Sequence, residues 1–144
     1  MVTAGLVLAV LSCPAGCARV EVAIPERAGD PACVRASTRW PDRVQGRDRV
    51  GTSADSPAVA AWGDPAVIAR CGLPMPGPTT DECIVVDGVD WVARRVEDGM
   101  VFLTYGRDPA IQVLVPSAYA PEPMVLPLFG AAARQIPQGR RRCS

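Results

Sequence analysis

The chain has 144 residues, and its 15 basic and 15 acidic side chains give a net charge of zero. With 49% apolar residues, this composition is typical of one soluble domain with a hydrophobic core. Every basic residue is Arg, since the sequence contains no Lys or His, and Asn is absent as well. A histidine-activated nucleophile, an imidazole metal ligand and a lysine Schiff base are therefore excluded. The balanced charge also argues against a nucleic-acid-binding domain, which needs a net basic surface.

The N-terminal region is typical of an export signal. Residues 4–11 are an uninterrupted run of small and aliphatic residues, and Pro14 and further small residues lead to Ala18. The run is shorter than the ~20 residues of a membrane span and fits the apolar core of a signal peptide. We therefore expect residues 1–18 to form a signal peptide or membrane-anchoring segment. The protein would then be secreted or held at the extracytoplasmic face of the cell membrane. The alternative is a buried N-terminal strand of a cytosolic protein.

Two processing routes remain open. The residues up to Cys13 resemble a lipobox, which would make Cys13 a lipidated first residue that tethers the domain to the membrane. Cleavage near Ala18 would instead leave four cysteines. An even number is usual for an exported protein with disulfides, so we favour cleavage. An N-terminal segment that stays uncleaved as an anchor is a third outcome.

The first helix is expected to begin at Pro31. Proline suits the first helical turn, Asp30 is a good N-cap, and Pro41 ends the helix. The polar stretch 42–57 is expected to be a loop with a short edge strand around residues 49–52.

Apolar segments separated by turn signals predict a β-rich middle. Hairpin-type turns are expected at residues 63–65, 87–88 and 97–99, and a proline-rich loop at residues 73–82. The expected strands are residues 59–62, 67–71, 84–86, 89–95, 100–105 and 111–115. A final helix is expected at residues 124–136, where apolar residues recur at helical spacing and Pro127 falls in the first turn.

These elements predict an α+β fold. It would consist of a single antiparallel sheet of about five or six short strands, with an N-terminal and a C-terminal helix on one face. The domain would span residues 19–139, between the export segment at residues 1–18 and an exposed basic tail at residues 140–144.

The cysteines beyond the export segment are the most specific feature of the sequence. They are Cys33, Cys71, Cys83 and Cys143. We expect them to form two disulfides, with Cys71 joined to Cys83 across the proline-rich loop and Cys33 joined to Cys143 between the terminal helices. This is one of three pairings that four cysteines allow. A zinc site is disfavoured because no C-x-x-C spacing is present.

Carboxylates are the remaining candidates for acid/base chemistry. Asp81, Glu82, Asp87 and Asp90 cluster around the expected strand after the proline-rich loop. Two converging carboxylates could hydrolyse a glycan. Turn and loop positions already explain these residues, however, so we assign no catalytic, cofactor-binding or metal-binding residue.

Arginine and aromatic residues supply the candidate contacts for a ligand or partner. Arg35, Arg39, Arg43 and Arg47 recur every fourth residue, but Pro41 interrupts the helix, so a solvated surface is favoured. The tryptophans could stack on sugars, although their apolar neighbours favour burial. The candidate contacts are Trp62, Trp91, Tyr105 and Arg107.

Three strings carry a resemblance to a known family. They are WGDPAVIARCGLPMP at residues 62–76, VDGVDW at residues 86–91 and FLTYGRDPAIQVLVPSAYAP at residues 102–121. Together they resemble an actinobacterial family known only as domain of unknown function 3515. The resemblance implies an envelope protein that is exported or anchored by an N-terminal hydrophobic segment. It implies no activity, because the family has none assigned.

The sequence thus predicts an exported cell-envelope protein that acts as a non-catalytic binding or accessory domain without a cofactor. Its partner would be an envelope protein or a cell-wall component, not a nucleic acid, and its N-terminal segment could contact the membrane. The alternatives are a carboxylate-dependent glycan hydrolase and a structural subunit of a membrane complex.

Overall fold

A computed structural model of the chain describes residues 18–144. The expected export segment therefore lies outside the described residues except for Ala18, and so does the candidate lipidation site Cys13. Among residues 18–144, no helix is long and apolar enough to cross a bilayer.

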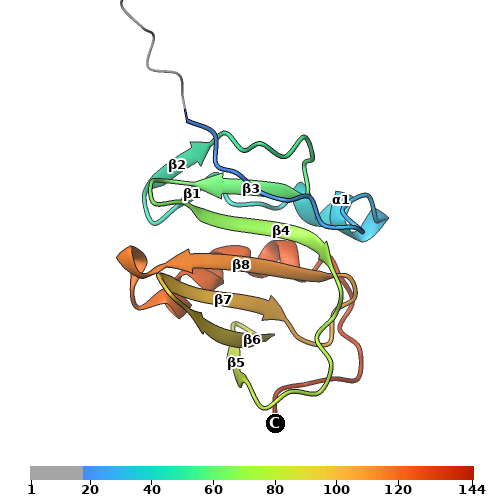
Figure 1. Cartoon of the computed structure of the whole chain (residues 1–144). Coiled ribbons are helices and arrows are strands. Elements are labelled where there is room, and N and C mark those ends of the chain that lie inside the picture. The colour runs from blue at the N-terminus through green and yellow to red at the C-terminus, as the bar shows by residue number, and fades with distance from the viewer. Residues whose placement is uncertain (1–17) are drawn as a thin grey trace, which may run out of the picture.

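The described residues form one antiparallel sheet of eight strands (Figure 1). The order across the sheet is β1-β2-β3-β4-β8-β7-β6-β5, so the last strand lies between β4 and β7. The strands are β1 (Arg43–Val44), β2 (Arg47–Val50), β3 (Val59–Trp62), β4 (Val67–Leu73), β5 (Glu82–Val86), β6 (Val89–Val96), β7 (Gly99–Thr104) and β8 (Ala110–Pro116).

The antiparallel sheet confirms the predicted architecture, but the expected number of five or six strands is too low. The stretch expected to hold one edge strand at residues 49–52 contains the hairpin of β1 and β2. Its turn residues Gln45 and Gly46 both have positive φ angles, 49° and 76°, as a tight two-residue hairpin requires. Residues 63–65, 87–88 and 97–98 lie in turns between successive antiparallel strands, close to the expected positions, and Gly99 begins β7.

Short helices cover one face of the sheet. They are α1 (Pro31–Ser37), the 3-10 helices η1 (Ser117–Tyr119) and η2 (Glu122–Phe129), and α2 (Gly130–Ala133). As predicted, Asp30 caps α1, because its carboxylate accepts a hydrogen bond from the N–H of Ala32. The predicted helix at residues 124–136 is wrong in detail. Pro123 and Pro127 have no N–H to donate, and most of this segment is a 3-10 helix followed by a single α-helical turn.

The core lies between the sheet and this helical layer. Figure 1 shows η2 and α2 behind β8. Phe129 at the end of η2 packs edge-on against Trp62 of β3, with ring centroids 5.4 Å apart, and against Trp40 after α1 at 6.3 Å. Both helical segments therefore cover the same face of the sheet.

The chain termini cross the opposite face. The leader, residues 19–28, bridges from Val20 to Thr52 and then runs to Gly72 of β4, whose carbonyl accepts a hydrogen bond from the N–H of Arg27. The C-terminal residues 140–144 were expected to be an exposed basic tail, and Arg140 and Arg142 are exposed. The segment is also held to the sheet, because Arg141 donates to the carbonyl of Pro76 and the N–H of Cys143 donates to the carboxylate of Asp90.

Two disulfides hold these layers together, but the predicted pairing is wrong. Cys33 of α1 is joined to Cys71 of β4, and Cys83 of β5 is joined to Cys143. Three strands separate β4 from β5, which places Cys71 and Cys83 about 19 Å apart at ~4.8 Å per strand. The Cα atoms of a disulfide lie no more than ~7 Å apart, so the expected bond between Cys71 and Cys83 is excluded.

Candidate binding site

The residues expected to contact a ligand do not form a common surface. Trp62 and Trp91 are fully buried in the core, so neither offers surface to a ligand. Tyr105 is half-buried. Arg107 is only 6% exposed, and its guanidinium donates to the carbonyls of Ala133 and Ile136.

Arg107 fastens the end of α2 to the connection between β7 and β8. Burial lowers the pKa of its guanidinium, and the nearby positive charges of Arg142 and Arg134 lower it further. Because the last carbonyls of a helix have no partner within the helix, a buried arginine is a suitable donor for them. The geometry therefore gives Arg107 a structural task.

The carboxylates expected to be acid/base candidates do not gather at one point. Asp81 and Asp87 flank the two ends of β5, whose five residues span about 17 Å at ~3.4 Å per residue. A hydrogen bond from Arg94 to Asp81, 2.6 Å long, lowers the pKa of that carboxyl.

The other two carboxylates lie in different environments. Asp90 is buried and accepts the N–H of Cys143 at 2.8 Å. Glu82 is exposed on β5. Within residues 18–144, no three acidic or cysteine side chains lie close enough together to hold a metal ion.

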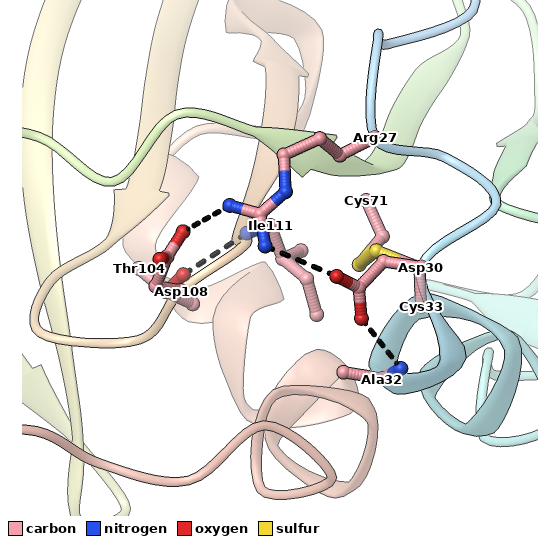
Figure 2. Close-up of polar contacts among 8 residues, drawn as sticks. All are labelled: Arg27, Asp30, Ala32, Cys33, Cys71, Thr104, Asp108 and Ile111. Atoms are coloured by element: carbon pink, nitrogen blue, oxygen red, sulfur yellow. Dashed lines mark hydrogen bonds and ion pairs between the residues drawn. A yellow bond between two sulfur atoms is a disulfide. The ribbon is translucent and has the colours of Figure 1, made fainter.

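A separate ion cluster joins the leader to the sheet. Figure 2 shows the Arg27 guanidinium between the carboxylates of Asp108 and Asp30, at 2.6 and 3.0 Å. The N–H of Ala32, and to a smaller extent Arg27, hold the pKa of Asp30 below its usual value. In the same view, the N–H of Ile111 donates to the hydroxyl of Thr104, which fixes the start of β8. All charges of this cluster are already paired, so it serves to position α1 and the leader.

Charged side chains also lie near the turn between β3 and β4. On one side of this turn lies a pocket of about 220 Å³. Its polar walls come from three separate segments: Gln45 and Arg47 from the β1–β2 hairpin, Asp64 from the turn, and Tyr119 from η1. Tyr119 is fixed in place because its hydroxyl donates to the carbonyl of Pro65 at 2.8 Å.

A second pocket lies on the other side of the same turn. Its volume is about 510 Å³, and it lies between the leader and strands β2 and β4. Its walls are mainly apolar, with Val20, Val50 and Ile68, and Arg19 also lines it. Asp64 is part of the wall of both pockets. Strand alternation places Val50 and Ile68 on the face opposite to Arg47, so the two pockets open on opposite faces of the sheet. We call the first pocket, lined by Gln45, Arg47, Asp64 and Tyr119, the Asp64 groove.

Gly63 permits the close packing beside this groove. Its φ angle of 75° lies in the left-handed region that favours glycine. A Cβ atom at this position would lie 2.2 Å from the Tyr119 hydroxyl and 3.1 Å from the Arg47 side chain. The Trp-Gly-Asp-Pro turn therefore brings two side chains distant in sequence up to Asp64.

The charges of the groove have no partners within the described part of the chain. The ion pairs found among residues 18–144 involve neither Arg47 nor Asp64. Both side chains are exposed. The groove can therefore offer one carboxylate and one guanidinium group to a ligand.

Sequence reasoning missed this groove. It explained the turn at Asp64 as a purely structural feature and Arg47 as part of a solvated surface. The Trp-Gly-Asp-Pro string was a usable signal for the turn. Nothing local in the sequence could place Arg47 and Tyr119 beside it, because both come from other segments.

Residues 1–140 match the family model described as "Protein of unknown function (DUF3515)". No curated protein and no solved structure is significantly similar to the chain.

Proposed function

The chain belongs to the family described as protein of unknown function DUF3515, and we propose that it is an exported, disulfide-stabilised binding domain of the cell envelope. Its N-terminal apolar segment would direct export and either be removed near Ala18 or hold the domain at the membrane. Its partner would be a component of that envelope.

The two disulfides are the observation that carries this proposal. Structural disulfides persist in oxidising compartments and are rare in the cytosol. Here they fix both ends of the domain, since one anchors α1 to the sheet and the other anchors the C-terminal residues to the edge strand β5. The pairing of all four cysteines beyond the export segment fits a protein that folds after export.

A binding role is favoured over catalysis because of how the charged groups are used. The carboxylates around β5 are distributed along the strand, and Asp81 and Asp90 already have partners in the fold. The glycan-hydrolase alternative requires two carboxyl groups about 5–9.5 Å apart at one cleft. The Asp64 groove instead combines one carboxylate with the Arg47 guanidinium, an arrangement suited to recognition.

Thiol trapping combined with protease accessibility tests this proposal. The full chain is produced in a bacterial host, and spheroplasts are treated with protease before and after lysis. Acid-quenched samples are alkylated with a mass-adding maleimide, with and without reductant. We expect the protease to degrade the protein before lysis. Cys33, Cys71, Cys83 and Cys143 should react with the maleimide only after reduction.

The variant Cys83→Ser is the matched control for pairing. It should release one reactive thiol, and peptide mapping should identify that thiol as Cys143. Protein that is protected until lysis and fully alkylated without reductant would contradict export.

A further inference from the structure

We propose that the disulfide between Cys83 and Cys143 is a redox-controlled latch. A dithiol would reduce it while the bond between Cys33 and Cys71 stays closed. The C-terminal strap, residues 140–144, would then leave β5 while the domain remains folded. This inference goes beyond the binding role proposed above, because it gives the domain two states and names the class of reagent that converts one into the other.

The two disulfides differ in their access to solvent. Cys33 and Cys71 are both 0% exposed and belong to the core. Cys83 and Cys143 are each partly exposed, and Cys83 lies on the edge strand β5. Thiol–disulfide exchange requires an attacking thiolate to reach a sulfur atom. The latch can therefore be attacked in the folded protein, whereas the buried bond becomes accessible only when the core opens.

The opening reaction is a thiol–disulfide exchange. A thiolate of the dithiol attacks one sulfur of the latch, forms a mixed disulfide with it and displaces the other cysteine as a thiolate. The second thiol of the reagent then attacks the mixed disulfide, which frees the first cysteine and closes a disulfide within the reagent. Two electrons and two protons pass from the reagent to the protein, so that Cys83 and Cys143 become thiols.

A dithiol suits this reaction better than a monothiol. After the first step, the displaced cysteine lies close to the mixed disulfide and can attack it, which restores the latch. A second thiol on the same reagent acts at a high effective concentration and completes the reduction before this reversal.

The core does not depend on the strap. None of residues 137–144 is buried, and the last buried residue of the chain is Ile136. Arg107 donates to the carbonyls of Ala133 and Ile136, so the chain before the strap stays attached after the latch opens. Reduction therefore frees a segment that contributes no buried side chain.

The disulfide is the main restraint on the strap. Figure 1 shows the C-terminus close to β5, to which the latch joins it. Apart from the disulfide, the strap is held to the sheet side by the bond from Arg141 to the Pro76 carbonyl, 2.9 Å, and by the bond from the N–H of Cys143 to Asp90, 2.8 Å. Water can replace both hydrogen bonds, so their net contribution is small.

Opening the latch would change the surface beside β5. Asp90 is only 3% exposed and accepts the N–H of Cys143. Val85, its cross-strand neighbour on β5, is already 59% exposed. Departure of the strap would leave the Asp90 carboxylate free to accept a hydrogen bond from a partner next to an exposed apolar side chain. The closed form lacks this combination.

The test is a kinetic trapping experiment on the purified, fully oxidised chain. The protein is incubated with dithiothreitol, quenched with acid at intervals, labelled with N-ethylmaleimide in denaturant and analysed by peptide mapping. We expect Cys83 and Cys143 to become labelled together, at least about tenfold faster than Cys33 and Cys71. The core pair should react readily only when urea is present during reduction. Glutathione, a monothiol, should open the latch more slowly at the same thiol concentration.

Amide hydrogen exchange shows whether the strap leaves. After reduction of the latch, the amides of Arg142 and Cys143 should lose protection while those of β4 and β8 keep it. The control is the double variant Cys83→Ser/Cys143→Ser, which has no latch. Its exchange pattern should match that of the reduced wild type and should not respond to dithiothreitol.

Four results would overturn the proposal. They are equal rates of reduction for the two disulfides, earlier reduction of the core pair, loss of protection throughout β4 and β8 when the latch opens, and strap amides that stay protected after reduction. A glutathione rate equal to that of dithiothreitol would contradict the choice of a dithiol. Because the experiment uses purified protein in a defined redox buffer, its outcome does not depend on the export test.

Discussion

At the scale of single residues, burial separates arginines that sequence alone cannot distinguish. Arg107 is buried, and its Nη1 donates to the carbonyl of Ala133, which ends α2, and to that of Ile136 just beyond it. Arg47 is exposed and has no ion pair among residues 18–144. Arg107 was one of the four expected ligand contacts, while Arg47 was expected to lie on a solvated surface, because the sequence does not show which arginine points inward. The three-dimensional structure moves the candidate site to the other residue.

Truncating Arg107 should therefore damage stability. Arg107→Ala removes the side-chain donor of the Ile136 carbonyl, leaves the Ala133 carbonyl with only the N–H of Ile136, and opens a cavity beside α2. We expect a loss of about 3 kcal/mol in the free energy of unfolding, measured by urea denaturation. Arg95→Ala, which removes an exposed arginine from β6, is the control and should change stability by less than about 0.5 kcal/mol. Equal stability of the two variants would show that Arg107 does not support α2.

Asp30 should make stability depend on acid pH. Its folded pKa is lowered by the N–H of Ala32 and by Arg27, so its contribution is complete above the unfolded pKa of about 3.9. The contribution is lost as the pH falls through the folded pKa. Asp30→Asn keeps a capping side chain but removes the charge. Denaturation midpoints should show wild type more stable than this variant above about pH 5, with the difference shrinking below about pH 4. A difference that grows with acidification would contradict the assignment.

At the scale of elements, periodicity predicted the regular parts of the fold and failed where side chains do not alternate. Strands β3, β4, β6, β7 and β8 have alternating or continuous apolar residues, and each was expected within a few residues of its observed bounds. The β1–β2 hairpin is polar and mostly exposed, so nothing in its pattern indicates a sheet. The ion pair between Arg43 and Asp48 and the tight turn hold this hairpin together instead.

The bulge in β4 depends on Gly72, where the leader docks. Gly72 has a φ angle of 117°, and a Cβ atom there would lie 2.5 Å from the backbone of Arg27 and Ala28. Backbone atoms cannot rotate away, so Gly72→Ala must push the leader from β4. We expect a loss of about 2–3 kcal/mol in urea denaturation.

Gly77→Ala provides the matched control, because no atom lies within 4 Å of its added Cβ. It should leave the urea midpoint nearly unchanged. If both glycine variants unfold at the same midpoint, the docking of the leader does not depend on Gly72.

At the scale of the whole molecule, strand order decides the features that sequence could not provide. Insertion of β8 between β4 and β7 separates neighbours in sequence and brings distant segments together. The set of four paired cysteines was predictable from their even number. Their pairing was not, because it depends on which strands are adjacent. The Asp64 groove has the same origin, since its walls come from two hairpins and η1.

The disulfide between Cys83 and Cys143 should contribute strongly to stability. It joins residues 60 positions apart, and the loop-entropy model gives about 4 kcal/mol for such a closure. The double variant Cys83→Ser/Cys143→Ser should lose about this much in urea denaturation, while the Cys33–Cys71 bond stays intact. Loss of less than about 1 kcal/mol would mean that the C-terminal residues are held by their hydrogen bonds alone.

The most direct measurement for an exported, oxidised binding domain is its intact mass, taken on protein from the membrane and culture fractions of its native host, before and after reduction. Cleavage near Ala18 and two disulfides predict a mass that lacks the first ~18 residues and rises by about four hydrogens on reduction. A lipid-sized addition at Cys13 would keep the export assignment but make the domain a tethered one. A full-length, unmodified chain with a mass that reduction does not change would contradict both export and the disulfide-stabilised fold.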